Sequence, residues 1–128
     1  MQNLEQIRAA AALPVAQHTT KADVNKIPAM IITNGLLAAI AFANERKNDG
    51  QEAKRPAMQA VFDGAARHLA LVGIVPGAID SDSLIRGLAG PNRPEATSVR
   101  LQRATTEVLA FIAYVKRFAA CDQDAPAD

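Results

Sequence analysis

Residues 101–120 read LQRATTEVLAFIAYVKRFAA, and the spacing of their apolar side chains indicates the fold class. Its small and apolar residues return every three or four positions, which is the spacing of one face of an α-helix. They are Leu101, Ala104, Thr105, Val108, Ile112, Val115 and Ala119. Together with the residues that lead into it after Pro91–Pro94, the stretch predicts a helix from about residue 95 to residue 120, with a length of about 40 Å at 1.5 Å per residue.

Four further helical segments are expected upstream of this one. Each is bounded by a proline, a cap residue or a glycine. They cover about 2–13 with an end or kink at Pro14, Lys26–Pro28 to Lys47 with Pro28 in the first turn, Pro56 to Gly73, and a short segment from an N-cap at Ser81 to Gly90.

The dipeptide Asn34-Gly35 interrupts the second of these segments. Between apolar runs it is a strong signal for a β-hairpin. However, the flank 36–43 is rich in alanine without polar alternation, and no other strand is available for pairing. We therefore predict a continuous helix, in which Gly35 costs about 1 kcal/mol relative to alanine. That cost suggests that another group approaches the backbone at this point.

Composition agrees with a helical domain. The chain has 128 residues, which fits one domain, and much of its 49% hydrophobic content is alanine, the best helix former. The sequence thus predicts an all-α fold, a small single-domain bundle of about five helices over residues 1–121. An acidic tail that we expect to be disordered follows over residues 122–128.

The charge distribution is not that of a strongly basic, dedicated nucleic-acid binder. The net charge is +1, and three acidic residues stand in the tail at Asp122, Asp124 and Asp128. Without them, 14 basic residues face 10 acidic ones, so the remaining body carries about +4, which is mild for a nucleic-acid binder. Cys121 is the single cysteine, and neither a signal peptide nor a membrane-spanning run is apparent, so we expect a cytoplasmic protein without a membrane partner.

Catalytic chemistry is not apparent in the sequence. His18 and His68 have no cysteine or carboxylate at the spacing of metal ligands, and each is expected to be an ordinary surface or boundary residue. Cys121 follows a predicted helix and precedes an aspartate, an environment that raises a thiol pKa. Residues 80–83 are better explained as a helix cap than as a cation loop. We predict no catalytic residue, no metal site, no cofactor and no enzymatic activity.

Basic residues are the remaining chemistry of the chain. On the last helix Arg103, Tyr114 and Arg117 form a stripe opposite the apolar face, with Arg100 and Lys116 on its flanks. Glu107 lies one turn after Arg103 and can pair with it. Two interpretations stay open, a solvated helix face and a surface that contacts phosphates with Tyr114 available for stacking. The loop bracketed by Arg46, Lys47, Lys54 and Arg55 could extend such a surface or simply keep the protein in solution.

Two stretches resemble a known family. Residues 26–42, KIPAMIITNGLLAAIAF, are similar to the signature of the small subunit of the type III-B CRISPR effector, the Cmr RNA-silencing complex, in which Lys and Pro-x-x-Ile precede Asn-Gly-Leu and a closing Ala-Phe. Residues 101–120 resemble the C-terminal helix of that family, with its Lys-Arg-Phe-Ala ending. The chain departs from the family at Leu101, where Tyr is usual, at Tyr114, where Trp is usual, and at Pro14, which interrupts a longer first helix.

This resemblance implies a non-catalytic RNA-binding and scaffolding subunit. Its partners would be the guide and target RNA, the backbone and large subunits of the Cmr complex, and copies of itself along the filament. The residues expected to bind nucleic acid are Lys26, Arg46, Lys47, Arg100, Arg103, Lys116 and Arg117. A structural motif is expected at Pro28, Asn34, Gly35, Phe42 and Phe118. The alternatives are a helical adaptor that binds only protein and, less well fitted, a helix-turn-helix DNA binder.

Overall fold

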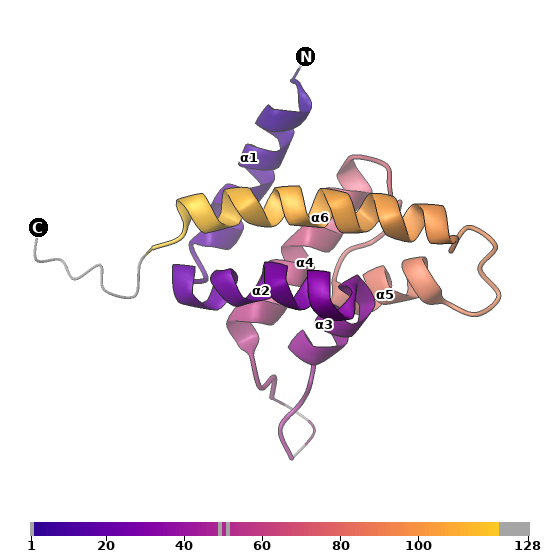
Figure 1. Cartoon of the computed structure of the whole chain (residues 1–128), viewed down its shortest axis with the longest axis horizontal. Helices are drawn as coiled ribbons and strands as arrows, with labels where there is room; N and C mark the ends of the chain where they lie inside the picture. Colours follow the sequence, from indigo (N-terminus) through magenta and orange to yellow (C-terminus); the bar gives the residue numbers. More distant parts are fainter. Residues whose placement is uncertain (1, 49, 51, 121–128) are drawn as a thin grey trace, which may run out of the picture.

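The computed structural model describes residues 2–48, 50 and 52–120 (Figure 1). This part of the chain contains six α-helices: α1 (Leu4–Ala16), α2 (Lys21–Asn34), α3 (Leu36–Ala43), α4 (Pro56–Leu71), α5 (Ser81–Ala89) and α6 (Ser98–Phe118). Within it, β pairing is limited to two isolated bridges, Thr20 with Ala120 and Arg46 with Ala53. The predicted all-α fold is therefore confirmed. The predicted tail over residues 122–128 lies outside the described residues.

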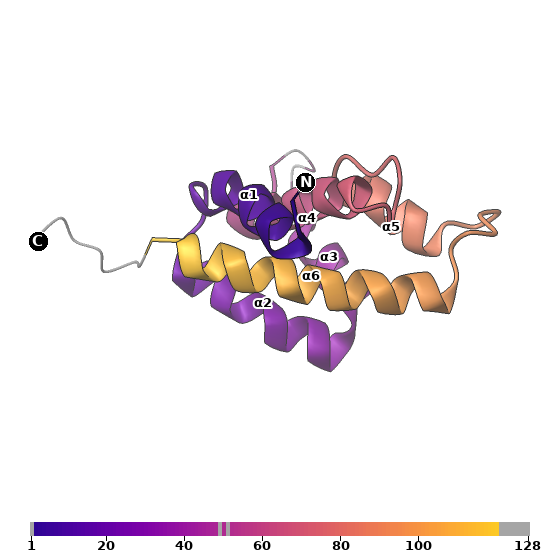
Figure 2. The ribbon, with the colours of Figure 1, turned by 90° about the horizontal axis from the view of Figure 1, so that it is seen from above.

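Helix α6 is the central element of the bundle. Seen from above, it lies between α2 on one side and α1, α4 and α5 on the other, and α1, α2 and α4 all pack against it (Figure 2). The core beneath it is built from aromatic and branched side chains that are fully buried, such as Phe62, Ile27, Phe111 and Ile112. The apolar face predicted for this helix is thus the face that holds the bundle together.

The second predicted helix is two helices. At Gly35 the backbone has φ 94° and ψ 157°, so α2 ends there and α3 begins in a new direction. The prediction of a continuous helix was wrong, and no hairpin forms either. A Cβ placed on Gly35 would meet nothing within 4 Å, which also contradicts the expected close approach. Glycine is needed at this point because its positive φ is strained for any L-residue with a side chain.

Both prolines that were expected near helix ends lie inside helices. Helix α1 continues through Pro14 to Ala16, and the carbonyl that loses its N–H partner belongs to Ala10, an exposed residue where water can take over. Helix α2 begins earlier than predicted because the hydroxyl of Thr20 caps it by accepting from the backbone N–H of Asp23. Pro28 therefore lies in the second half of α2 and not in its first turn.

The N-cap of the short helix α5 lies one residue earlier than predicted. Asp80 is its N-cap and accepts from the backbone N–H of Ser83, whose hydroxyl in turn bonds back to Asp80. These hydrogen bonds hold the pKa of Asp80 below its ordinary value, the backbone bond contributing most. Ser81 instead donates to the Asp63 carboxylate through its backbone N–H and its hydroxyl, which ties α5 to α4.

Two further features bear on the surface of the molecule. Helices α1 and α4 cross at Gly64, where a Cβ would collide with the side chain of Val15. Phe118, which was expected to pack, is 41% exposed and lies 6.2 Å from the Tyr114 ring in a tilted arrangement. In the part of the chain that the structure describes, no helix combines the length and the apolar character needed to cross a membrane.

Candidate nucleic-acid interface

Three basic residues, Lys21, Lys116 and Arg117, lie close together where the end of α6 contacts the start of α2. The Lys21 ammonium donates to the backbone carbonyls of Lys116 at 2.8 Å and of Arg117 at 3.4 Å. The backbone N–H of Lys21 also donates to the Ala120 carbonyl at 2.9 Å. A cation at the last carbonyls of a helix satisfies them and complements the helix dipole. Lys21, which the sequence analysis did not single out, thus fixes the chain end that carries Lys116 and Arg117.

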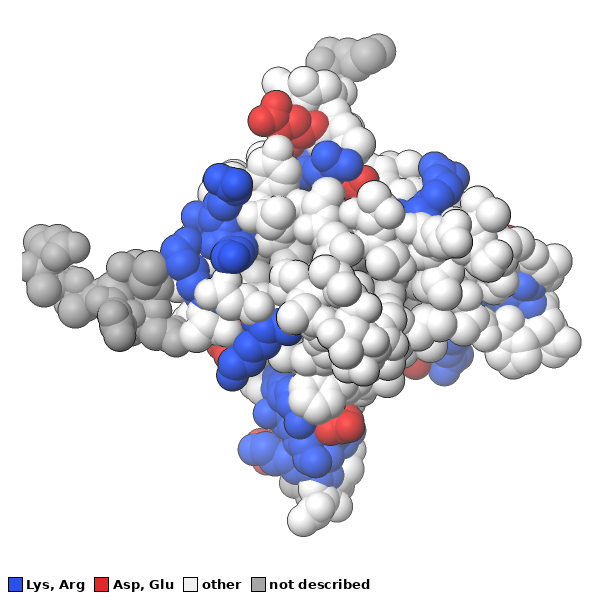
Figure 3. Space-filling model, viewed as in Figure 1, with Lys and Arg blue, Asp and Glu red and all other residues white. Residues whose placement is uncertain are grey.

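Helix geometry leaves the side chains of Lys116 and Arg117 exposed beside Lys21. Both residues follow the buried Val115 and point away from the core. Among the described residues neither has an ion-pair partner. Figure 3 shows Lys and Arg side chains gathered over this end of α6 and the start of α2, at the left of the view, with little acidic surface next to them. We call Lys21, Lys116 and Arg117 the basic end of the molecule.

Arg103 lies about 20 Å from the basic end along α6 at 1.5 Å per residue, on the same side of the helix as Arg117 and on the opposite flank from Lys116. It is exposed and borders a shallow groove with Leu4, Val72 and Ile74. Tyr114 lies between Arg103 and the basic end but is only partly accessible. The predicted stripe on α6 therefore exists, with its cations exposed and its tyrosine half-buried.

Arg100, in the first turn of α6, is hydrogen-bonded to two backbone carbonyls. Its Nε donates to the Ile74 carbonyl at 2.8 Å and its guanidinium donates to the Gly87 carbonyl at 3.2 Å. Both carbonyls belong to the α4–α5 region, so Arg100 joins the first turn of α6 to that region. Its donors are engaged by the fold, which leaves fewer of them for phosphate.

The other predicted RNA-binding residues, Lys26, Arg46 and Lys47, are not part of the basic end. Lys47 pairs with Glu52 at 3.4 Å on the exposed α3–α4 loop. Arg46, also on this loop, lines a hollow with three aspartates, Asp63, Asp80 and Asp82. Lys26 is exposed on α2 and lines a separate hollow. The structure therefore distributes the seven predicted residues over several surfaces.

Phe42, from the predicted motif, is held by a cation. The Arg55 guanidinium carbon lies 3.5 Å from the centre of the Phe42 ring. The same guanidinium donates to the Phe42 carbonyl at 3.0 Å and to the Glu45 carboxylate at 2.9 Å. A cation over an aromatic face is attracted by the ring quadrupole, so Arg55 ties the start of α4 to the end of α3.

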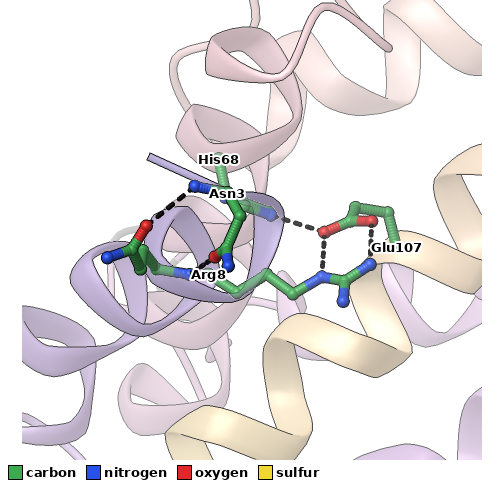
Figure 4. A network of polar contacts seen from close by, with 5 residues as sticks. Asn3, Arg8, His68 and Glu107 are labelled. Carbon is green, nitrogen blue, oxygen red and sulfur yellow. Dashed lines mark hydrogen bonds and ion pairs between the residues drawn. The ribbon is translucent and has the colours of Figure 1, made fainter. Parts of the chain in front are cut away.

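A buried polar network joins α1, α4 and α6, and its Glu107 lies one turn after Arg103 on α6 (Figure 4). The Glu107 carboxylate accepts from Arg8 of α1 at 2.7 and 2.8 Å and from His68 Nε2 of α4 at 2.7 Å. The side chain of Glu107 is 8% exposed and that of His68 is fully buried. Glu107 therefore pairs with Arg8 and His68 and not with Arg103, and the surface or boundary position expected for His68 was wrong.

The network changes the ionisation of its charged members. The bidentate hydrogen bond from Arg8 holds the pKa of Glu107 below its ordinary value, against the opposing effect of burial. The same bond raises the pKa of Arg8. Glu107 is therefore kept as a carboxylate between two donors, an arrangement that binds helices together.

Periodicity could have located both residues. His68 follows Val61 and Ala65 at helical spacing on the buried face of α4, and Glu107 falls between Ala104 and Val108 on the buried face of α6. A polar residue on an apolar face requires a buried partner. The partner itself, Arg8, is 99 positions away from Glu107, and no local pattern points to it.

Within the described ranges there is no group of three or more histidine, cysteine, aspartate or glutamate side chains placed to hold a metal ion. Comparison with curated proteins gave no match, and comparison with solved structures gave none. A family model does match: CRISPR-associated protein (Cas_Cmr5), over residues 3–121 of the 128. The match spans all six helices. The chain therefore belongs to the Cas_Cmr5 family, the small subunits of the type III-B CRISPR effector, and associates with the other subunits of the Cmr complex.

Proposed function

We propose that this chain is a non-catalytic subunit that supports the guide and target RNA of the effector through its basic end. It also acts as a scaffold toward the backbone and large subunits and toward copies of itself in the filament. The observation that carries the RNA contact is the position of Lys116 and Arg117, exposed on a helix end that Lys21 fixes. Such cations attract phosphate without reading base sequence.

The expected strength of this contact follows from the charges. Arg103, Lys116 and Arg117 supply three phosphate contacts, and Lys21, whose ammonium also donates to two backbone carbonyls, supplies a fourth at most. Each contact to a single strand contributes about −0.7 to the slope of log K against log salt concentration, so the slope should be about −2 to −3. A surface of this kind supports an RNA that base pairing and other subunits already hold in place.

The non-catalytic part of the proposal rests on the state of the polar residues. Arg8, His68 and Glu107 are the best candidates for acid–base chemistry, but they bond to one another inside the bundle. A general base must reach the proton that it removes, and these groups face each other across packed helices. The chain therefore contributes contacts to the complex, and chemistry belongs to other subunits.

RNA binding by the purified chain tests the proposal. Charge reversal at Arg103, Lys116 and Arg117 should weaken binding of a fluorescent single-stranded RNA and flatten the salt slope by about 2. Circular dichroism should show that the bundle stays folded, because the three residues lie off the buried face of α6, with a loss of helicity confined to the last turn, where Lys116 and Arg117 complement the helix dipole. Arg86→Glu on α5, an exposed residue outside the proposed surface, is the matched control. Equal RNA affinity for the triple variant and the control would contradict the proposal.

A further inference from the structure

A groove with a chemistry unlike that of the basic end runs between α2 and α3 and on to the start of α4. It consists of two adjoining hollows of about 640 and 500 Å³, which share Met30 and Phe42 as their floor. The first hollow is completed by Asn34, Ala38, Ala41 and Glu45, and the second by Asp23, Lys26, Lys54, Arg55, Pro56, Ala57 and Met58. We call this feature the α2–α3 groove.

The charges on its rim leave a positive excess. Glu45 is held by Arg55 at 2.9 Å and by Lys54 at 3.9 Å, and the Asp23 carboxylate accepts the Thr20 hydroxyl. Lys26 is exposed and makes no ion pair with any described residue. Both acidic groups of the rim are thus engaged within the protein, and the free charge of the rim is a cation.

The floor of the groove favours a protein segment over RNA. Methionine adapts its shape to apolar partners, and two exposed alanines, Ala38 and Ala41, leave room for side chains that enter between α2 and α3. The Phe42 ring carries the Arg55 guanidinium on one face, so that face is closed to a nucleobase. Lys54 and Arg55 of the rim are paired with Glu45, which leaves Lys26 as the unpaired cation among the described residues of the rim, whereas apolar side chains would find a surface that is otherwise left to water.

We propose that the α2–α3 groove docks an acidic segment with apolar side chains from another protein subunit of the Cmr complex. The apolar side chains lie over Met30 and Phe42, and a carboxylate of the segment pairs with Lys26. The inference rests on the proposed scaffolding function and assigns it a surface. This surface begins at Asp23, about half a turn of α2 after Lys21, but shares no residue with the basic end, so that protein docking and RNA support can be tested with different substitutions.

Two matched double variants test whether the partner binds in the α2–α3 groove and whether it is acidic. Ala38→Glu/Ala41→Glu and Ala38→Lys/Ala41→Lys add side chains of similar length at exposed positions of α3, where both are tolerated by a helix. Each variant competes with the wild-type chain for incorporation into a complex reconstituted from the other subunits and guide RNA. The glutamate variant should be incorporated about ten-fold less than the lysine variant, because it places like charges against an acidic partner. Affinity of both free variants for single-stranded RNA should stay within about two-fold of wild type, since neither touches the basic end.

Photo-crosslinking identifies the occupant. Benzoylphenylalanine at position 41 in the reconstituted complex should join to a peptide of another subunit that contains Asp or Glu beside apolar residues. Crosslinks to RNA or to a second copy of this chain would overturn the inference, as would equal incorporation of the glutamate and lysine variants. Loss of RNA binding in the Arg103, Lys116 and Arg117 variant concerns only the proposed RNA contact, so the two claims fail separately.

Discussion

Replacing Glu107 by glutamine tests how the bundle is held together. The substitution keeps the size of the side chain and one acceptor oxygen but removes the charge that Arg8 and His68 share. Removing one partner of a buried ion pair costs about 3 to 5 kcal/mol. Arg8 is 24% exposed, so water can partly solvate its guanidinium, and we expect a loss of about 2 to 3 kcal/mol in the free energy of unfolding.

Urea denaturation followed by circular dichroism measures this loss. For a domain of this size, the same change should lower Tm by roughly 10 °C. Glu52→Gln is the matched control, because its pair with Lys47 is exposed at 66% and 55% and should contribute less than about 0.5 kcal/mol. If Glu107→Gln is no more destabilising than Glu52→Gln, the network does not join the three helices as described.

The pH dependence of the same variant gives an independent test. Because the pKa of Glu107 is lower in the folded chain than its ordinary value of 4.5, its contribution is complete above about pH 4.5. That contribution disappears as the pH falls through the lowered pKa, where the carboxylate takes up a proton. The difference in unfolding free energy between wild type and Glu107→Gln should therefore shrink on acidification. A constant difference from pH 7 to pH 3 would show that charge is not what stabilises the network.

Three further substitutions are expected to change stability in ways that urea denaturation can measure. Gly64→Ala should cost about 1 to 3 kcal/mol, because its Cβ collides with Val15 where α1 crosses α4, and a neutral effect would mean that the helices separate without loss. Gly35→Ala should cost about 1 to 3 kcal/mol through backbone strain alone, although the space around it is open, and a stabilising effect would contradict the break between α2 and α3. Arg100→Met should cost about 1 to 2 kcal/mol by leaving two carbonyls unpaired while RNA affinity of the free chain stays unchanged, and a selective loss of RNA affinity would restore Arg100 to the RNA surface.

Local patterns in the sequence predicted the helices but not all of their ends. The apolar spacing of residues 101–120 places α6 correctly, because a seam that packs against several helices must repeat every three or four positions. At Gly35 the same spacing continues on both sides of a break, and only the backbone angle reveals it. Pro14 and Pro28 suggested helix boundaries, but both lie inside helices. Packing holds a helix together across a missing hydrogen bond.

The candidate site was less predictable than the fold. Exposure of Lys116 and Arg117 follows from their place on α6, opposite the apolar face. The clamp by Lys21 and the engagement of Arg100 do not, because both depend on backbone carbonyls supplied by distant segments. A count of charges treats all basic residues alike. In the structure some of these side chains donate hydrogen bonds to backbone carbonyls, and others are left exposed at the surface.

Target-RNA release from the assembled complex tests whether the basic end contacts RNA. The chain with reversed charges at Arg103, Lys116 and Arg117 is incorporated in place of the wild-type chain, and dissociation of labelled target RNA is then followed at increasing salt concentration. We expect full incorporation, faster release of target RNA and a weaker salt dependence of the retained binding. Normal retention of RNA together with loss of the variant from the complex would contradict the account. The basic end would then be a protein-docking surface, and the chain an adaptor without RNA contact.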